Sequence, residues 1–227
     1  MFNIPIEQIT KGSELRQKGK IAELALGYGG GKGALLSMGA LKMGLSEDEL
    51  PDLVSAWRNS NIAITRFWKE CEKASIKAIE LGEQTLVNGK ILIGRSRKHL
   101  WVKLPYGRKI MYYLPQIAEN QFCSKCITYM HLNQTTKQWD RVETFGGKLV
   151  ENIVQAFARD CLAYSLVKLE VLGFKTVFHV HDEAVIEVGK GEVFAEEIAD
   201  IMGQEIPWAK GLPLSADAYE CDFYMKD

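Results

Sequence analysis

The chain has 227 residues, of which 47% are hydrophobic and 25% charged, a balance typical of a globular protein and not of a disordered or collagen-like one. Its net charge is −1, but the two halves differ in charge. Residues 1–110 carry 18 Lys+Arg and 11 Asp+Glu, whereas residues 111–227 carry 10 Lys+Arg and 18 Asp+Glu. This asymmetry is compatible with a polyanion site beside a metal site, and more simply with two solvated surfaces of opposite charge.

The pattern along the chain predicts an α+β fold. Ser13 is a suitable N-cap for a first helix that ends at the glycines after Leu26, and Ser46 with Glu49 has capping-box spacing. Further helices are predicted over residues 33–43, 46–59 and 62–81. Short strands follow over residues 86–93, 99–104, 109–114, 127–132 and 138–144. The remainder is predicted as a long helix over 149–172, strands over 175–181 and 184–188, a helix over 193–202 and a strand over 214–219.

Four residues of the first helix share one face, because Arg16, Lys20, Leu24 and Tyr28 follow at four-residue intervals. Two cations one turn apart can bind two phosphates, and the apolar and aromatic positions beyond can hold a base or sugar. A solvated basic stripe has the same spacing. The glycines that follow Tyr28 favour a ligand site, since they allow the helix end to flex or approach a ligand closely. They match neither a Walker A loop nor a dinucleotide fingerprint, because they follow a helix.

His181-Asp182-Glu183 lies between two predicted strands. Adjacent exposed carboxylates suit a hard divalent cation such as Mg²⁺, although an ordinary polar turn has the same composition. His179 and His181 fall on one face, which makes a zinc pair conceivable, but no third ligand is evident.

The long helix carries a polar stripe of Asn152, Gln155 and Arg159. These donors could contact base edges in a minor groove, or the stripe could be the solvent face of an amphipathic helix. The five cysteines show no framework spacing, and the Cys123-x-x-Cys126 pair has no partner pair at zinc spacing. With no signal peptide and no long apolar run, we expect reduced thiols, no membrane partner and a cytoplasmic location.

Together these motifs resemble those of family A DNA polymerases, the DNA polymerase I-like group, in their phage and prophage branch. Arg16, Lys20 and Tyr28-Gly29 resemble motif B, and His181-Asp182-Glu183 resembles motif C. The resemblance implies a fingers-like domain at 1–110, helical and then built of basic hairpins. It also implies a palm-like domain at 111–227 that contains the motif C hairpin.

For the nucleotide, the resemblance implies that Arg16 and Lys20 hold the triphosphate of an incoming deoxynucleoside triphosphate and that Tyr28 stacks near the templating site. Leu24 belongs to the same nucleotide-binding face, at a position where the family usually carries Phe or Tyr.

For catalysis and DNA, the resemblance implies that Asp182, with Glu183 beside it, ligates two Mg²⁺ ions for nucleotidyl transfer to a primer 3′-hydroxyl. Gln155 and His181 would contact primer–template DNA. Arg159 is added from the polar stripe alone.

Motif A, which supplies a second metal-binding Asp, is not found, because only 15 residues precede Arg16 and none is Asp. The chain is therefore expected to be the C-terminal part of a polymerase in a bacterial or phage-infected cell, completed by an upstream segment or partner chain, or self-associating. The alternative is a non-catalytic DNA-binding or assembly module derived from a polymerase. It rests on the missing carboxylate and on seven basic residues without an acid between Lys90 and Lys109.

Overall fold

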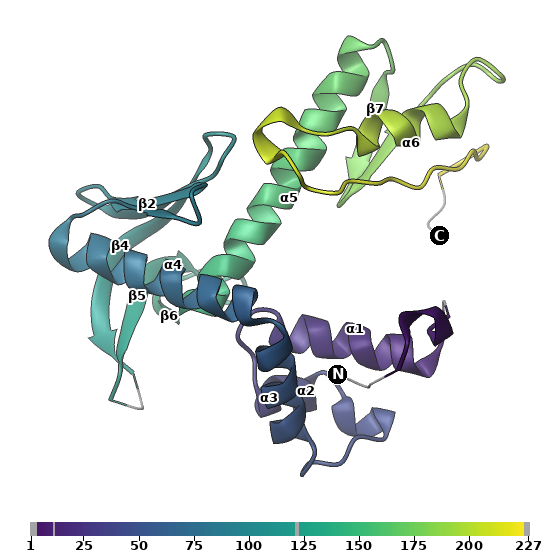
Figure 1. Cartoon of the computed structure of the whole chain (residues 1–227). Helices are drawn as coiled ribbons and strands as arrows, with labels where there is room; N and C mark the ends of the chain where they lie inside the picture. The colour runs from purple at the N-terminus through teal and green to yellow at the C-terminus, as the bar shows by residue number, and fades with distance from the viewer. Residues whose placement is uncertain (1–3, 11, 121–122, 225–227) are drawn as a thin grey trace. The chain divides into compact units, whose positions relative to one another are not determined.

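The computed structural model describes residues 4–10, 12–120 and 123–224 (Figure 1). Contacts divide the chain into two units. The first comprises Met1–Leu104 with Lys109–Ile153, and the second comprises Pro105–Arg108 with Val154–Asp227. Each unit is described by itself below. The α+β class predicted from the sequence is confirmed, with an antiparallel six-stranded sheet followed by a long helix.

The helices of the first unit are η1 (Ile6–Gln8), α1 (Glu14–Leu26), α2 (Lys32–Ser37), η2 (Ala40–Met43), α3 (Leu50–Ser60) and α4 (Ile62–Leu81). Ser13 caps α1 as predicted, because its hydroxyl accepts a hydrogen bond from the Arg16 N–H at 3.3 Å. The helix predicted over 33–43 is broken at Gly39, whose φ of 86° is left-handed. Near the predicted start at 46, the Glu49 carboxylate accepts from the Ser46 N–H at 2.8 Å, yet α3 begins only at Leu50.

The sheet of the first unit is an antiparallel meander in the order β1-β2-β3-β4-β5-β6. Its strands are β1 (Thr85–Val87), β2 (Ile91–Arg95), β3 (His99–Lys103), β4 (Lys109–Glu119), β5 (Lys125–Leu132) and β6 (Trp139–Thr144). The single strand predicted over 86–93 is a hairpin, because Asn88 and Gly89 adopt positive φ and turn the chain. Strand β4 runs past its predicted end at Leu114, where φ is 46° and the register with β5 shifts.

Helix α4 packs against β1, β2, β3 and β4 (Figure 1). The face of the sheet toward this helix, the inner face, carries the buried side chains of Ile93, Leu100, Val102 and Tyr112. Because strand side chains alternate, the opposite or outer face carries the rows of His99 with Tyr113, Trp101 with Met111, and Lys103 with Lys109. The boundary predicted after residue 110 falls within β4, and the fingers-like and palm-like domains remain predictions.

The second unit has a small core. It contains most of α5 (Gly146–Val171), a hairpin of β7 (Thr176–Val180) and β8 (Glu183–Ile186), α6 (Ala195–Gly203) and η3 (Pro207–Ala209). Cys161, Ile206 and Ala209 form a buried cluster that Phe157 and Trp208 flank. By contrast, every side chain of β7 and β8 is at least partly exposed.

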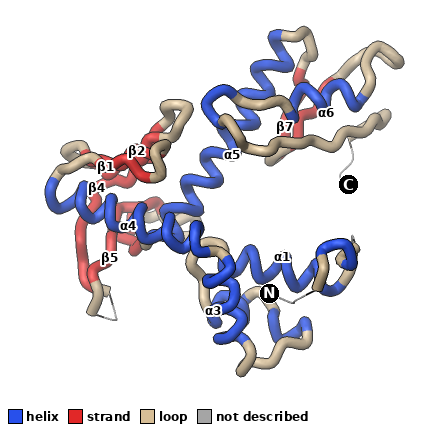
Figure 2. The backbone as a smooth tube through the Cα atoms, viewed as in Figure 1, coloured by secondary structure: helices blue, strands red, loops and turns tan. Residues whose placement is uncertain are grey.

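The strand predicted over 214–219 does not form, and the segment is a loop (Figure 2). A strand needs a neighbour for its backbone N–H and C=O groups. Within the described residues, the β7–β8 sheet has two strands and no third one beside them.

Candidate functional site

The candidate nucleotide-binding side chains lie on the open side of α1. Ala22, Ala25 and Leu26 are buried, whereas Arg16, Lys20 and Leu24 are exposed and Tyr28 is half-buried. No ion pair involves Arg16 or Lys20 in the part of the chain that the structure describes. Both cations are therefore open to an anion from solvent.

Close packing of the chain on itself explains two glycines, Gly30 after Tyr28 and Gly147 at the start of α5. A Cβ at Gly30 would lie 1.9 Å from the carbonyl oxygen of Ala25, and a Cβ at Gly147 would lie 2.1 Å from that of Tyr28. These distances are far below any van der Waals contact, so both positions require glycine. The end of α1 is thus fitted closely against the start of α5. Packing accounts for Gly30, whereas a Cβ at Gly31 would meet nothing within 4 Å. Our expectation that the glycine run allows flexibility or close approach of a ligand stays a prediction.

The candidate metal residues lie at the tip of the β7–β8 hairpin. Val180 pairs with Glu183, so His181 and Asp182 form a two-residue loop. His181 has a φ of 47°, at a position where such loops usually place glycine. A non-glycine residue there stores strain of about 1–3 kcal/mol, which is commonest at functional sites. Both loop side chains are exposed.

Glu183 is held by a residue that belongs to none of the sequence motifs. The Tyr224 hydroxyl donates to the Glu183 carboxylate at 3.1 Å, and this hydrogen bond raises the pKa of Tyr224. The ring of Tyr224 also packs edge-on against Phe178 of β7, with ring centroids 5.1 Å apart. No sequence spacing links positions 183 and 224. The one feature of the sequence that could have drawn attention to Tyr224 is its aromatic side chain.

The three residues of the polar stripe of α5 differ in their surroundings. Asn152 donates to the Tyr112 hydroxyl at 3.0 Å, and burial raises the pKa of Tyr112 to about 12; Asn152 is therefore a packing residue. Gln155 is exposed. Arg159 is exposed too, and its Nη2 lies 3.3 Å from Nε2 of His179.

The structure brings Arg159 and His179 together in the second unit, which also contains Gln155 and the His181–Glu183 turn. The α1 residues belong to the first unit. Across residues 4–10, 12–120 and 123–224, no group of three or more His, Cys, Asp or Glu side chains could hold a metal ion. The carboxylate oxygens of Asp182 and Glu183 are donors that a hard cation such as Mg²⁺ prefers, so they fit one part of such a site.

The cysteines take no part in a metal cluster of the described residues. All five are free; Cys71, Cys126 and Cys161 are buried, and Cys123 and Cys221 are exposed. Burial raises the pKa of the Cys71 thiol to about 12 and raises the pKa of Cys126 and Cys161 as well. The Cys123-x-x-Cys126 pair is thus split between an exposed turn and a buried strand position.

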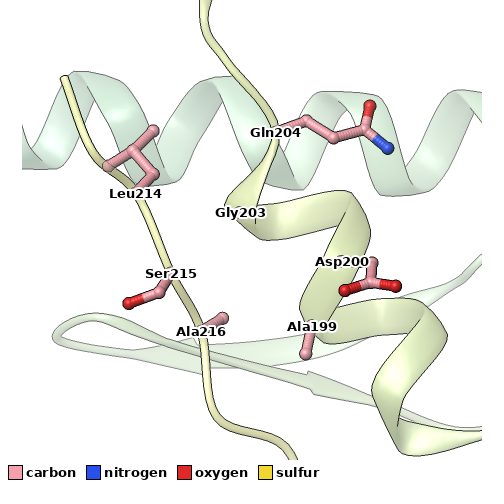
Figure 3. Close-up of a pocket in the computed structure, with 7 residues that line it drawn as sticks. All are labelled: Ala199, Asp200, Gly203, Gln204, Leu214, Ser215 and Ala216. Carbon is pink, nitrogen blue, oxygen red and sulfur yellow. The ribbon is translucent and has the colours of Figure 1, made fainter. Parts of the chain in front are cut away.

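A cavity of about 400 Å³ lies between the end of α6 and the loop at 214–216 (Figure 3). Seven residues line it: Ala199, Asp200, Gly203, Gln204, Leu214, Ser215 and Ala216. None of them is a candidate site residue. Asp200 is the one charged residue among these seven. The side-chain oxygen of Gln204 accepts a hydrogen bond from Lys168.

Comparison with known proteins gives one relative. The chain is 51% identical to the "DNA polymerase" of Bacillus phage SP02 over 228 positions, which cover the whole chain and 35% of that protein. The chain thus spans about a third of the length of this relative. No family model and no solved structure matches. Among the described helices, none has the length and apolar character needed to cross a bilayer. The chain is therefore related in sequence to part of a phage DNA polymerase.

Proposed function

We propose that the chain is the C-terminal fingers-and-palm part of a family A DNA polymerase, which transfers nucleotides from deoxynucleoside triphosphates to a primer 3′-hydroxyl on a DNA template. The observation that carries this proposal is the 51% identity over the whole chain to a phage DNA polymerase. The exposed face of α1 and the strained turn at His181 add physical support, because each places polar groups where a ligand could reach them.

In this proposal Arg16 and Lys20 bind the triphosphate and stabilise the negative charge that develops on it. Both side chains are exposed on successive turns of α1. Leu24 and Tyr28 continue the same face, where they would contact the sugar and base. The close fit of Gly147 against the Tyr28 carbonyl holds this end of the helix in place.

Asp182 and Glu183 would hold Mg²⁺ at the hairpin tip. When bound, two such ions activate the primer hydroxyl and stabilise the leaving pyrophosphate. Tyr224 orients the Glu183 carboxylate through its hydrogen bond, and His181 and Gln155 would contact the primer end. Two ions need more carboxylates than these neighbours supply, so we propose that an upstream segment or partner chain adds the missing one.

Exposed apolar side chains of the second unit support a partner. Val171 is 80% exposed and Phe194 is 74% exposed, and no side chain of the β7–β8 hairpin is buried. Where exposed apolar side chains adjoin one another, they are typical of a surface that binds another protein segment. An upstream polymerase segment, a separate chain or a second copy of this chain would cover it.

Primer extension with Mg²⁺ and four deoxynucleoside triphosphates tests the proposal. The chain is assayed alone and together with the part of the phage SP02 polymerase that lies outside the matched region. We expect extension only in the mixture and a loss of about 100-fold or more in Asp182→Ala. Asp200→Ala, which removes another exposed acid of the second unit, is the matched control and retains activity. Extension by the chain alone refutes the need for a further carboxylate. No extension by any mixture refutes the polymerase assignment.

A non-catalytic DNA-binding or assembly module is the second candidate function. It is favoured by one observation: the seven basic residues between Lys90 and Lys109 are all exposed. In this case DNA binding weakens steeply with salt, is unchanged by Asp182→Ala, and is accompanied by no extension in the assay above.

A further inference from the structure

The outer face of the six-stranded sheet carries a row of three aromatic rings. His99 of β3 and Tyr113 of β4 have ring centroids 5.3 Å apart, and Tyr113 and Trp139 of β6 are 6.0 Å apart. Trp139 is 58% exposed, and the other two rings are half-buried. Cross-strand packing stabilises a sheet, but it does not require a tryptophan with most of its surface in water.

Three lysines lie on or next to the strands that carry His99 and Tyr113. Lys103 and Lys109 are paired across β3 and β4 on the same face, and Lys98 lies in the turn just before His99. None of the three forms an ion pair within the described residues. Lys109 also lies over the ring of Trp101, with its Nζ 4.4 Å from the ring centroid.

The remaining charges of this face leave it positive. Arg141 of β6 donates to the carbonyl oxygen of Leu114 and to the hydroxyl of Thr128. Glu143, which pairs with Thr128, is the acid at the far end of β6. A second copy of the chain placed on this face would bring lysines against lysines, so a polyanion is the better partner by charge.

We propose that this outer face binds single-stranded DNA, with bases stacked on His99, Tyr113 and Trp139 and phosphates contacting Lys98, Lys103 and Lys109. Aromatic side chains inside a basic surface are the usual way to bind a single strand without sequence preference. A duplex fits less well, because its bases already stack on each other. The choice of DNA rests on the proposed function, in which the unpaired template is the available single strand.

Binding of a fluorescein-labelled 15-nucleotide oligothymidylate to the full chain, measured by anisotropy, tests this assignment. Trp139→Ala and Tyr113→Ala are each expected to weaken binding about tenfold, whereas Tyr113→Phe keeps the ring and the affinity. Phe223→Ala removes an exposed ring of the second unit and is the control without effect. Lys98→Gln and Lys103→Gln are each expected to lower the slope of log affinity against log salt by about 0.7.

The Asp182→Ala variant separates this proposal from the proposed function, because it should bind the oligonucleotide as the unchanged chain does. The proposal is overturned if the chain does not bind the oligonucleotide, or if Trp139→Ala and the two lysine variants bind like the unchanged chain. It is also overturned if a blunt duplex or oligouridylate of equal length binds more tightly. Each of these results leaves the primer-extension test of the polymerase assignment unaffected. Circular dichroism melting verifies that each variant is folded.

Discussion

The ion pair between Arg108 and Asp160 offers a quantitative test of packing in the second unit. The Asp160 side chain is 7% exposed. Its Oδ1 accepts from Arg108 Nε at 2.7 Å, and Arg108 Nη2 donates to the carbonyl oxygen of Ala156 at 2.5 Å. The second carboxylate oxygen, Oδ2, is buried and has no hydrogen bond among the described residues. Arg108→Met therefore removes the counter-ion of a carboxylate that is already incompletely satisfied.

The magnitude follows from burial. Removal of one partner from a fully buried pair costs about 3–5 kcal/mol, because a charge is left uncompensated. The Arg108 side chain is 44% exposed, so water can partly replace it, and we expect a loss of about 2–3 kcal/mol in the free energy of unfolding. In Arg108→Met/Asp160→Leu both charges are absent, and most of the loss should be recovered.

Urea unfolding followed by tryptophan fluorescence measures these values. Trp208 is a suitable reporter because Tyr106, two residues before Arg108, has its ring 5.2 Å from that of Trp208. The unchanged chain should have the highest urea midpoint, the double variant an intermediate one and Arg108→Met the lowest. If Arg108→Met lies within about 0.5 kcal/mol of the unchanged chain, or if the double variant is no more stable than the single one, the argument from an uncompensated buried charge is wrong.

Three further predictions concern single positions. His181→Gly should raise the free energy of unfolding by about 1 kcal/mol or less, since strain relief exceeds the entropic cost of glycine. In the same variant, primer extension by the mixture should fall at least about tenfold. Activity equal to that of the unchanged chain would contradict a role of the His181 ring. Gly30→Ala should destabilise the chain by about 3 kcal/mol or more in chemical denaturation, whereas Gly31→Ala, whose Cβ meets nothing within 4 Å, should stay within about 0.5 kcal/mol; similar values for both would refute the packing argument. At pH 8 a thiol reagent should modify exposed Cys123 quickly and Cys71, whose pKa burial raises to about 12, only after unfolding; rapid modification of Cys71 would show that it is accessible.

Elements marked by local chemistry could be predicted from the sequence. The start of α1 follows from the Ser13 cap, and the end of α4 from Gly82, which adopts the left-handed conformation expected after a helix. The turn between β7 and β8 follows from polar residues between two apolar runs. Asn88-Gly89 is also a local turn signal between β1 and β2, but the pattern predicts one strand there because apolar residues lie on both sides of the turn.

Features that depend on distant residues could not be predicted. Tyr224 reaches Glu183 across 41 positions, and Arg108 reaches Asp160 across 52. The glycine requirement at Gly147 exists only because the Tyr28 carbonyl lies beside it. No periodicity or local propensity contains such contacts, since they arise from the tertiary fold.

The meander of six strands has a consequence for the order of folding. Each strand pairs with its neighbour in the sequence, so the sheet can form by successive hairpins without closing a long loop, and low contact order favours rapid folding. Helix α1 is different, because its end fits against Gly147, more than a hundred residues later in the chain. During synthesis, α1 therefore reaches its final packing only after the whole sheet and the first turn of α5 have been made. The helix that carries Arg16 and Lys20 is thus synthesised early but reaches its final packing late.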